Sequence, residues 1–180
     1  RLNLATVRDA YAPAADRAVS LCWLFHLAGD IQQPLHGGHL ISGRFPLSDR
    51  AGESAFVRPA AGGTAIDLHA YWDNAVGGDE DDDANVEAAR VRLDQAWPRS
   101  ALKELTGKAD PDAFRSWADE SFGLARSAVY KSGTFEGAVT AAAAMPVPPG
   151  YSDERRTTGE RRVALGGHRI ADAVRAALGK

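Results

Sequence analysis

The segment FHLAGDIQQPLH, residues 25–36, places two histidines and one aspartate at the end of a run that favours a helix. Alanine and leucine are frequent in residues 14–33, and Pro34 disfavours helical geometry in the residue before it, so we expect one helix over residues 14–33. His26 and Asp30 are four residues apart and therefore share one face of that helix. The apolar side chains around His26 predict a central helix.

A second segment, LHAYWD at residues 68–73, repeats this spacing on a short helix expected over residues 66–75. His69 and Asp73 share a face there, and an imidazole with a carboxylate is a common ligand set for zinc. One such step alone is close to chance, and a single histidine on an apolar helix is more often bonded to a carbonyl. Two steps together with His36 favour a metal site.

The rest of the chain also predicts helices, with no long strand pattern. The first two expected helices cover residues 84–105, with a kink or break at Pro98, and residues 110–130, with Asp110 as cap and Pro111 in the first turn. The last covers residues 152–178 and is expected to begin a few residues into that range. The apolar positions of the first of these are Val86, Val91, Leu93 and Leu102. Residues 37–63 read as a loop with a short extended piece at Phe56 and Val57, and the acidic run 79–83 as a solvated loop before a helix. We therefore expect an all-α fold in a single domain over residues 1–180.

Composition fits a globular protein of 180 residues, of which 44% are hydrophobic and 25% charged. No apolar run approaches a membrane span, and no signal peptide is expected within the chain. The formal charge of −3 is unlike that of a protein that gains affinity from the phosphates of duplex DNA, so bound metal would have to supply positive charge locally. The single cysteine, Cys22, excludes an internal disulfide and is expected to be a small buried apolar residue.

Other chemically active side chains have simpler interpretations. His39 is expected to face solvent, and His168 to be structural or exposed. The loop arginines either contact phosphate or are ordinary loop residues, and the sequence favours neither: Arg44, Arg50 and Arg58. Four aromatic residues are expected in the core: Tyr71, Trp72, Trp97 and Trp117.

The two histidine segments resemble the signatures of the zinc-dependent, single-strand-specific nucleases. These are the mung-bean-type class I nucleases, and the zinc-dependent phospholipases C are their sister branch. WADES at residues 117–121, AVY at residues 128–130 and GGHRIA at residues 166–171 resemble later helices of the same family. The resemblance covers most of the chain.

This resemblance implies a mostly helical fold around three zinc ions. His36, His69 and Asp73 match the three protein ligands of one zinc, an arrangement that leaves a position open for water. His26 and Asp30 match ligands of a closely spaced zinc pair. Asp30 matches the carboxylate that bridges this pair, which makes it the candidate catalytic residue.

The implied activity is zinc-dependent hydrolysis of phosphodiester bonds in single-stranded DNA and RNA, giving 5′-phosphate products, with 3′-nucleotides as a further substrate class. The resemblance also implies secretion or a periplasmic location and no membrane partner. A phospholipase C relative is the alternative enzyme, but that branch uses glutamate where this chain has Asp73. A non-catalytic, zinc-stabilised helical fragment is the alternative outside the enzymes.

Two departures from the family pattern bear on these expectations. The family begins with a tryptophan and further histidines that bind zinc, whereas this chain begins with Arg1 and has no histidine before His26. We therefore expect the chain to be the C-terminal portion of such an enzyme, with one complete zinc site and half of another. A glycine–glycine–asparagine step of the family is matched by AGE at residues 51–53, or more weakly by GGT at residues 62–64.

Overall fold

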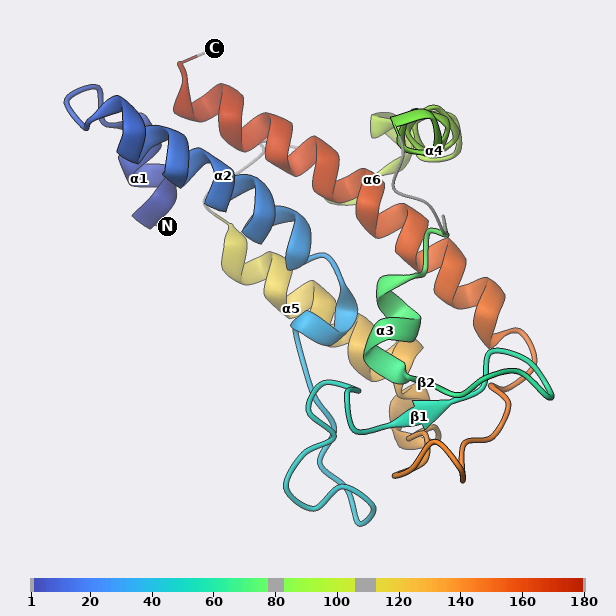
Figure 1. Ribbon diagram of the computed structural model, residues 1–180. Helices are drawn as coiled ribbons and strands as arrows, with labels where there is room; N and C mark the ends of the chain where they lie inside the picture. The colour runs from blue at the N-terminus through green and yellow to red at the C-terminus, as the bar shows by residue number, and fades with distance from the viewer. Residues whose placement is uncertain (1, 78–82, 106–112, 180) are drawn as a thin grey trace.

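The computed structural model describes residues 2–77, 83–105 and 113–179 (Figure 1). In these residues the helices are α1 (Leu2–Arg8), α2 (Ala14–Asp30), α3 (Leu68–Asp73), α4 (Asp83–Ala96), α5 (Phe114–Leu124) and α6 (Tyr151–Ala177). Single helical turns are η1 (Pro34–His36), η2 (Arg99–Ala101), η3 (Lys103–Leu105), η4 (Ala125–Val129) and η5 (Lys131–Gly133). Strands β1 (Phe56–Val57) and β2 (Ile66–Asp67) pair antiparallel, with Phe56 opposite Asp67. The fold is mostly helical, which confirms the predicted class, and β1 falls at the predicted extended piece.

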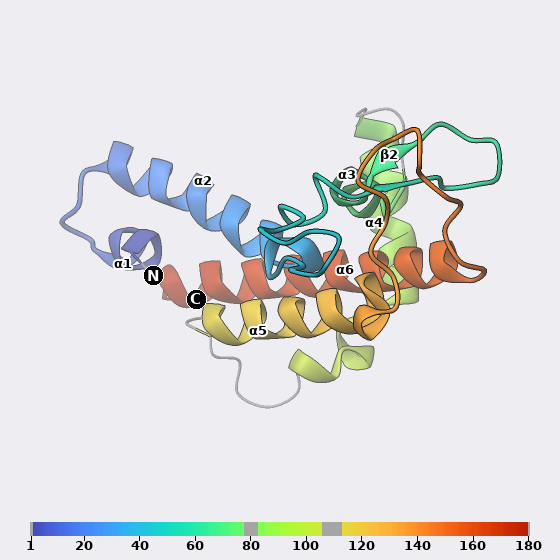
Figure 2. The same cartoon turned by 90° about the horizontal axis from the view of Figure 1, so that it is seen from below.

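The longest helix, α6, is the axis of the arrangement and spans 27 residues, close to the predicted 152–178. Helices α2 and α5 run along one half of it, and α3 with the β1–β2 pair lies beside the other half (Figures 1 and 2). The chain between α2 and α3 therefore crosses from one group of elements to the other. The turn η1, which follows α2, and the start of α3 come together at this crossing.

Helix α2 ends at Asp30, three residues earlier than predicted. The amides of Gln32 and Gln33 bond to the carbonyls of Gly29 and Asp30, so the chain leaves α2 in a tight turn. Gln33 then caps η1, because its side chain accepts a hydrogen bond from the Leu35 amide. Proline at the first position of η1 suits this start, since its missing N–H would have no helical partner there.

The prediction that α2 is central holds for only one of its faces. Leu24 and Ala28 are buried, but the side chains of Trp23, Phe25 and Leu27 are 51%, 44% and 47% exposed. A helix that packs against a single neighbouring layer buries one stripe, and the described residues cover only that stripe. Cys22 is exposed for the same reason, so its predicted burial is wrong.

The main core forms around two aromatic residues beneath the β1–β2 pair. Trp72 is 2% and Tyr151 is 1% exposed, and the Trp72 indole N–H donates to the Tyr151 hydroxyl at 3.0 Å. That hydroxyl donates in turn to the Val129 carbonyl at 2.8 Å. Because every polar atom of this aromatic pair has a partner, the pair fixes α3 firmly on the start of α6. Burial of Tyr71 and Trp117 likewise agrees with prediction.

The predicted helix 84–105 is divided at Trp97 and Pro98 into α4 and the turns η2 and η3, as the proline suggested. Leu93 and Leu102 are buried, whereas Val86 and Val91 are exposed, so the predicted apolar stripe is only partly used. Trp97 is half-buried rather than in the core. The predicted helix start at Asp110 and most of the acidic run 79–83 lie outside the described residues, and α5 is described from Phe114.

Candidate metal centre

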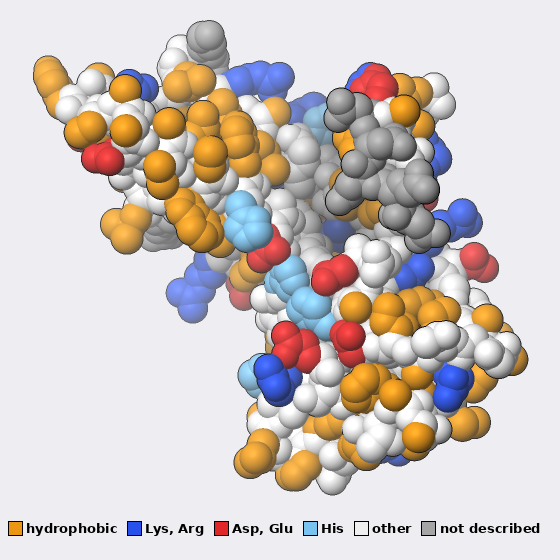
Figure 3. All heavy atoms as spheres, in the orientation of Figure 1, with side chains coloured by type: hydrophobic (Ala, Val, Ile, Leu, Met, Phe, Trp, Pro, Cys, Tyr) orange, Lys and Arg blue, Asp and Glu red, His pale blue; other side chains and the backbone are white. Residues whose placement is uncertain are grey.

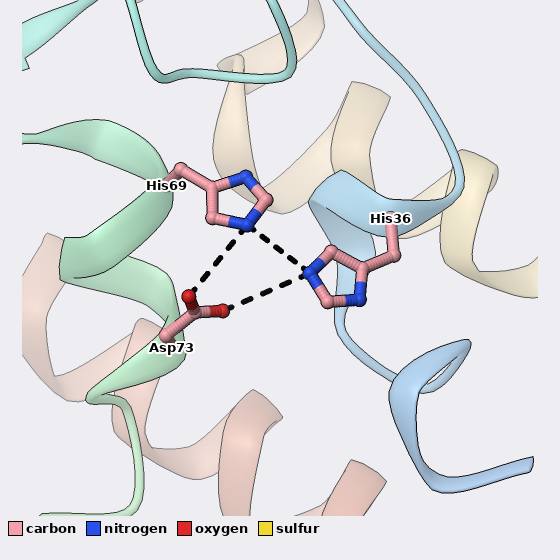
Figure 4. A group of neighbouring side chains, drawn as sticks. All are labelled: His36, His69 and Asp73. Carbon is pink, nitrogen blue, oxygen red and sulfur yellow. Dashed lines mark hydrogen bonds and ion pairs between the residues drawn. The ribbon is translucent and has the colours of Figure 1, made fainter. Parts of the chain in front are cut away.

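Three predicted ligands meet where η1 faces α3. The Nε2 atoms of His36 and His69 are 3.1 Å apart. Each also approaches the Asp73 carboxylate, at 3.9 Å for His36 and 3.6 Å for His69 (Figure 4). All three ligand atoms lie within 4.8 Å of one another, close enough to bind one metal ion. We refer to His36, His69 and Asp73 as the ligand triad.

Local structure brings each member of the ligand triad to this point. His69 and Asp73 are one turn apart on α3, which Asp67 caps by accepting a hydrogen bond from the Ala70 amide at 2.8 Å. His36 is the last residue of η1. The side chains are 23%, 21% and 47% exposed for His36, His69 and Asp73. A ligand arriving from solvent can therefore reach the site, whose acidic and histidine side chains gather in a hollow of the surface (Figure 3).

Backbone carbonyls fix the orientation of both imidazoles. The Nδ1 atom of His36 is 2.9 Å from the Asp30 carbonyl oxygen, and the Nδ1 atom of His69 is 2.9 Å from the Ala51 carbonyl oxygen. A carbonyl oxygen only accepts, so each Nδ1 carries the proton and donates it. The Nε2 lone pairs are then free for a metal. This is the usual outer support of a metal-binding histidine.

The loop that supports His69 has an unusual backbone. Arg50, Ala51 and Gly52 have φ values of +55°, +57° and +92°, which turn the Ala51 carbonyl toward the His69 ring. Asp49 anchors this loop, since its fully buried carboxylate accepts from the Leu40 amide at 2.9 Å and from the Tyr130 hydroxyl at 2.6 Å. Burial and the neighbouring carboxylate raise the pKa of Tyr130, so it stays a donor.

Replacing Gly52 by alanine is expected to lower the free energy of unfolding by roughly 2–4 kcal/mol. A Cβ atom at Gly52 would lie 2.9 Å from the His69 amide nitrogen, in a backbone conformation that side chains disfavour. Gly62→Ala is the matched control, because Gly62 has φ +76° but nothing within 4 Å of an added Cβ. The control should lose only about 1–2 kcal/mol in urea unfolding. Equal losses in the two variants would contradict close packing at Gly52.

The remaining two predicted site residues do not join the ligand triad. The Asp30 carboxylate lies behind His36, with Oδ1 3.0 Å from Nδ1 of that ring. His26 is exposed one turn earlier on α2, with its ring 5.9 Å from that of Trp23. Asp30 and His36 also line a pocket of about 270 Å³, whose apolar wall includes Leu27.

Gln33 is a residue of the site that the sequence did not reveal. Its Nε2 donates to Asp73 Oδ1 at 2.9 Å, and its Oε1 accepts from the Leu35 amide. Gln33 therefore joins the start of η1 to a member of the ligand triad on α3. Its place directly before Pro34 was the available signal for the capping role, but nothing in the sequence indicated the contact with Asp73.

The loop arginines mostly hold the backbone. Arg58 donates to the carbonyls of Gly63 and Ala144, and Arg44 donates to that of Gly137. Arg50 pairs at 2.9 Å with Glu53, and both side chains are exposed. These contacts favour the interpretation of Arg44 and Arg58 as ordinary loop residues.

A helical frame that brings two imidazoles and a carboxylate together at one point could bind a metal ion. Comparison with protein-family models matches residues 3–179 to a family described as S1/P1 Nuclease. The chain therefore belongs to the S1/P1 nuclease family, which consists of zinc-dependent nucleases. Comparison with curated proteins and with solved structures gave no match. None of the helices in the described part of the chain combines the length and the apolar character needed to cross a membrane.

Proposed function

We propose that this protein is a zinc-dependent phosphodiesterase that cleaves single-stranded DNA and RNA, leaves 5′-phosphate products and also accepts 3′-nucleotides. The observation that carries the proposal is the convergence of the His36 and His69 Nε2 atoms with the Asp73 carboxylate. Membership of a zinc-dependent nuclease family supports the substrate class. Export from the cytoplasm is part of the proposal and rests on the family alone.

The donor set fits zinc. Two neutral imidazoles and one carboxylate are a ligand set found at catalytic zinc sites, which keep one further position open. When bound, zinc supplies a Lewis acid that offsets negative charge on a phosphoryl group. This suits a chain whose formal charge is −3, because the positive charge that attracts phosphate would be concentrated at the site.

The protein's own residues hold and orient this centre. His36 and His69 keep their protons at Nδ1, on the carbonyls of Asp30 and Ala51, and offer Nε2 to the metal. Gln33 holds one oxygen of Asp73, which limits the rotation of that carboxylate. Such preorganised ligands bind metal without first losing side-chain freedom.

His26 and Asp30 are proposed as ligands of additional zinc ions, with Asp30 as the bridging catalytic carboxylate. This part of the proposal comes from the family resemblance of residues 25–36. In the described residues, the Asp30 carboxylate contacts His36 Nδ1, and both residues line the same pocket. A carboxylate in this place orients His36 even before any further metal binds.

The activity test uses an end-labelled single-stranded oligonucleotide, the same strand in a duplex, and phosphatidylcholine vesicles. The zinc-loaded chain is expected to cleave the single strand fastest, and the chelator-treated chain is expected to cleave nothing. Faster release of phosphocholine would favour the phospholipase C alternative. Zinc binding without hydrolysis of any substrate would favour the zinc-stabilised, non-catalytic domain, which the small ligand set of the described residues also fits.

A further inference from the structure

A buried charged network lies directly behind the candidate metal centre. Arg162 and Arg169 of α6 are 3% and 4% exposed, and both pair with Glu120 of α5 at 2.6–2.7 Å. Ser121 and Gln32 are also buried. The network thus connects α5 and α6 with the turn that follows α2.

This turn is where the ligand triad obtains its geometry. The Asp30 carbonyl orients His36, and the Gln33 side chain orients Asp73. Between them, the carbonyls of Ile31 and Gln32 lie beyond the hydrogen-bonded part of α2 and need partners from elsewhere. Ser121 Oγ donates to the Ile31 carbonyl, and Arg162 Nε donates to the Gln32 carbonyl at 3.0 Å.

The three guanidinium nitrogens of Arg162 each have a different task. Nε holds the Gln32 carbonyl, Nη1 pairs with Glu120 at 2.7 Å, and Nη2 donates to Ser121 Oγ at 2.8 Å. Only the planar fork of arginine reaches three partners in fixed directions, whereas lysine offers a single nitrogen. Arg162 also lines a pocket of about 200 Å³ together with Asp30, His36 and Asp73.

We propose that Arg162 is a positioning residue of the metal centre, which clamps the turn 31–33 through the Gln32 carbonyl and so presets the distance between His36 and Asp73. The inference rests on the proposed function, because it assumes that the ligand triad binds zinc. Arg162 touches neither metal nor substrate and acts through the backbone. Replacing Arg162 should make the positions of His36 and Asp73 less fixed, while both metal ligands remain present.

Arg169 provides a matched control. It is equally buried and shares Glu120, but it reaches the turn only through the Gln32 side chain, at 3.0 Å, and otherwise lies 4.9 Å from the Trp117 ring. Arg162→Lys and Arg169→Lys therefore each remove a similar set of buried hydrogen bonds. Only Arg162→Lys leaves the Gln32 backbone carbonyl without its arginine donor. A difference in zinc affinity between the two variants would therefore reflect the positioning of the metal ligands and not a general loss of stability.

The experiment measures zinc affinity by competition with a coloured chelator, the visible d–d absorption of bound Co²⁺, and urea unfolding of the metal-free chains. Both variants should lose similar stability. Arg162→Lys should bind zinc about tenfold or more weakly and change the Co²⁺ spectrum, as expected for loss of an outer-sphere partner. Arg169→Lys should keep the wild-type affinity within about threefold, a margin well below that outer-sphere effect.

Wild-type affinity and spectrum in folded Arg162→Lys would overturn the inference, and so would equal weakening in the two variants. If Arg162→Lys fails to fold, Ser121→Ala removes the neighbouring clamp on the Ile31 carbonyl at smaller cost. That variant should also weaken zinc binding, and unchanged affinity would overturn the inference. A wild-type chain that binds no zinc would instead overturn the proposed function and this inference with it.

Discussion

Asp73→Ala is expected to reduce zinc-dependent hydrolysis of a single-stranded oligonucleotide by at least about a hundredfold. Loss of an outer partner of a metal ligand already costs about 10–100-fold, and Asp73 is the only carboxylate of the ligand triad. Because Asp73 is 47% exposed and ends α3, its loss should leave helicity nearly unchanged. The measurement is the initial rate at saturating zinc, with far-UV circular dichroism as the folding check.

Asp153→Ala is the control for this variant. Asp153 is also a helical aspartate with a basic neighbour, but its side chain is 84% exposed on α6. Its carboxylate lies 4.0 Å from the Arg156 guanidinium, which is too far for a strong ion pair. Its removal should change neither rate nor helicity. Wild-type activity of Asp73→Ala would show that the ligand triad is not the active centre, whatever the zinc content of the variant.

Glu120→Gln is expected to lower the free energy of unfolding by about 3 kcal/mol or more. The substitution removes the only carboxylate that contacts Arg162 and Arg169 among the described residues, and leaves two buried cations facing each other. Urea unfolding of the metal-free chain measures the loss. The exposed pair of Glu87 and Arg90 on α4 supplies the control, since Glu87→Gln should leave the unfolding midpoint almost unchanged.

The effect of Glu120 should also depend on pH in a defined direction. Burial raises the pKa of this carboxyl, but hydrogen bonds from Arg169 and Arg162 outweigh burial and hold the pKa below its usual value. A carboxyl with a lower pKa in the folded than in the unfolded chain stabilises the fold above its unfolded pKa. That stability is lost as the pH falls below about 4, so the wild type and Glu120→Gln should converge there. If the difference in free energy of unfolding between the wild type and Glu120→Gln grows as the pH falls, the stabilising role of the ionised Glu120 carboxylate is contradicted.

Local spacing in the sequence accounts for much of the fold and of the ligand triad. Residues four apart on a helix must share a face, so the placement of His69 with Asp73 followed from sequence alone. The exit of the chain at Pro34 likewise placed His36 outside α2. The end of helix α6 was predicted within one residue, because its polar and apolar residues alternate with helical period over a long stretch, but the helix begins a few residues earlier than expected.

Contacts between distant residues could not be predicted in this way. Gln33 meets Asp73 across 40 positions, and Arg162 meets Gln32 across 130, so no local pattern marks either pair. Arginines on a long polar helix normally face solvent, but Arg162 is buried and its partners are Gln32, Glu120 and Ser121, which lie far from it in the sequence. The exposed face of α2 was missed for a related reason, since periodicity shows which side is apolar but not how much of it is covered.

The zinc content of the folded, desalted wild-type chain, determined by elemental analysis, tests most directly whether the ligand triad binds metal. The ligand triad predicts at least one tightly held zinc per chain, lost on treatment with a strong chelator and recovered on adding zinc. Asp73→Ala should retain less zinc than the wild type under the same conditions. A chain that is fully folded by circular dichroism yet holds no zinc after exposure to it would contradict a metal site at the ligand triad.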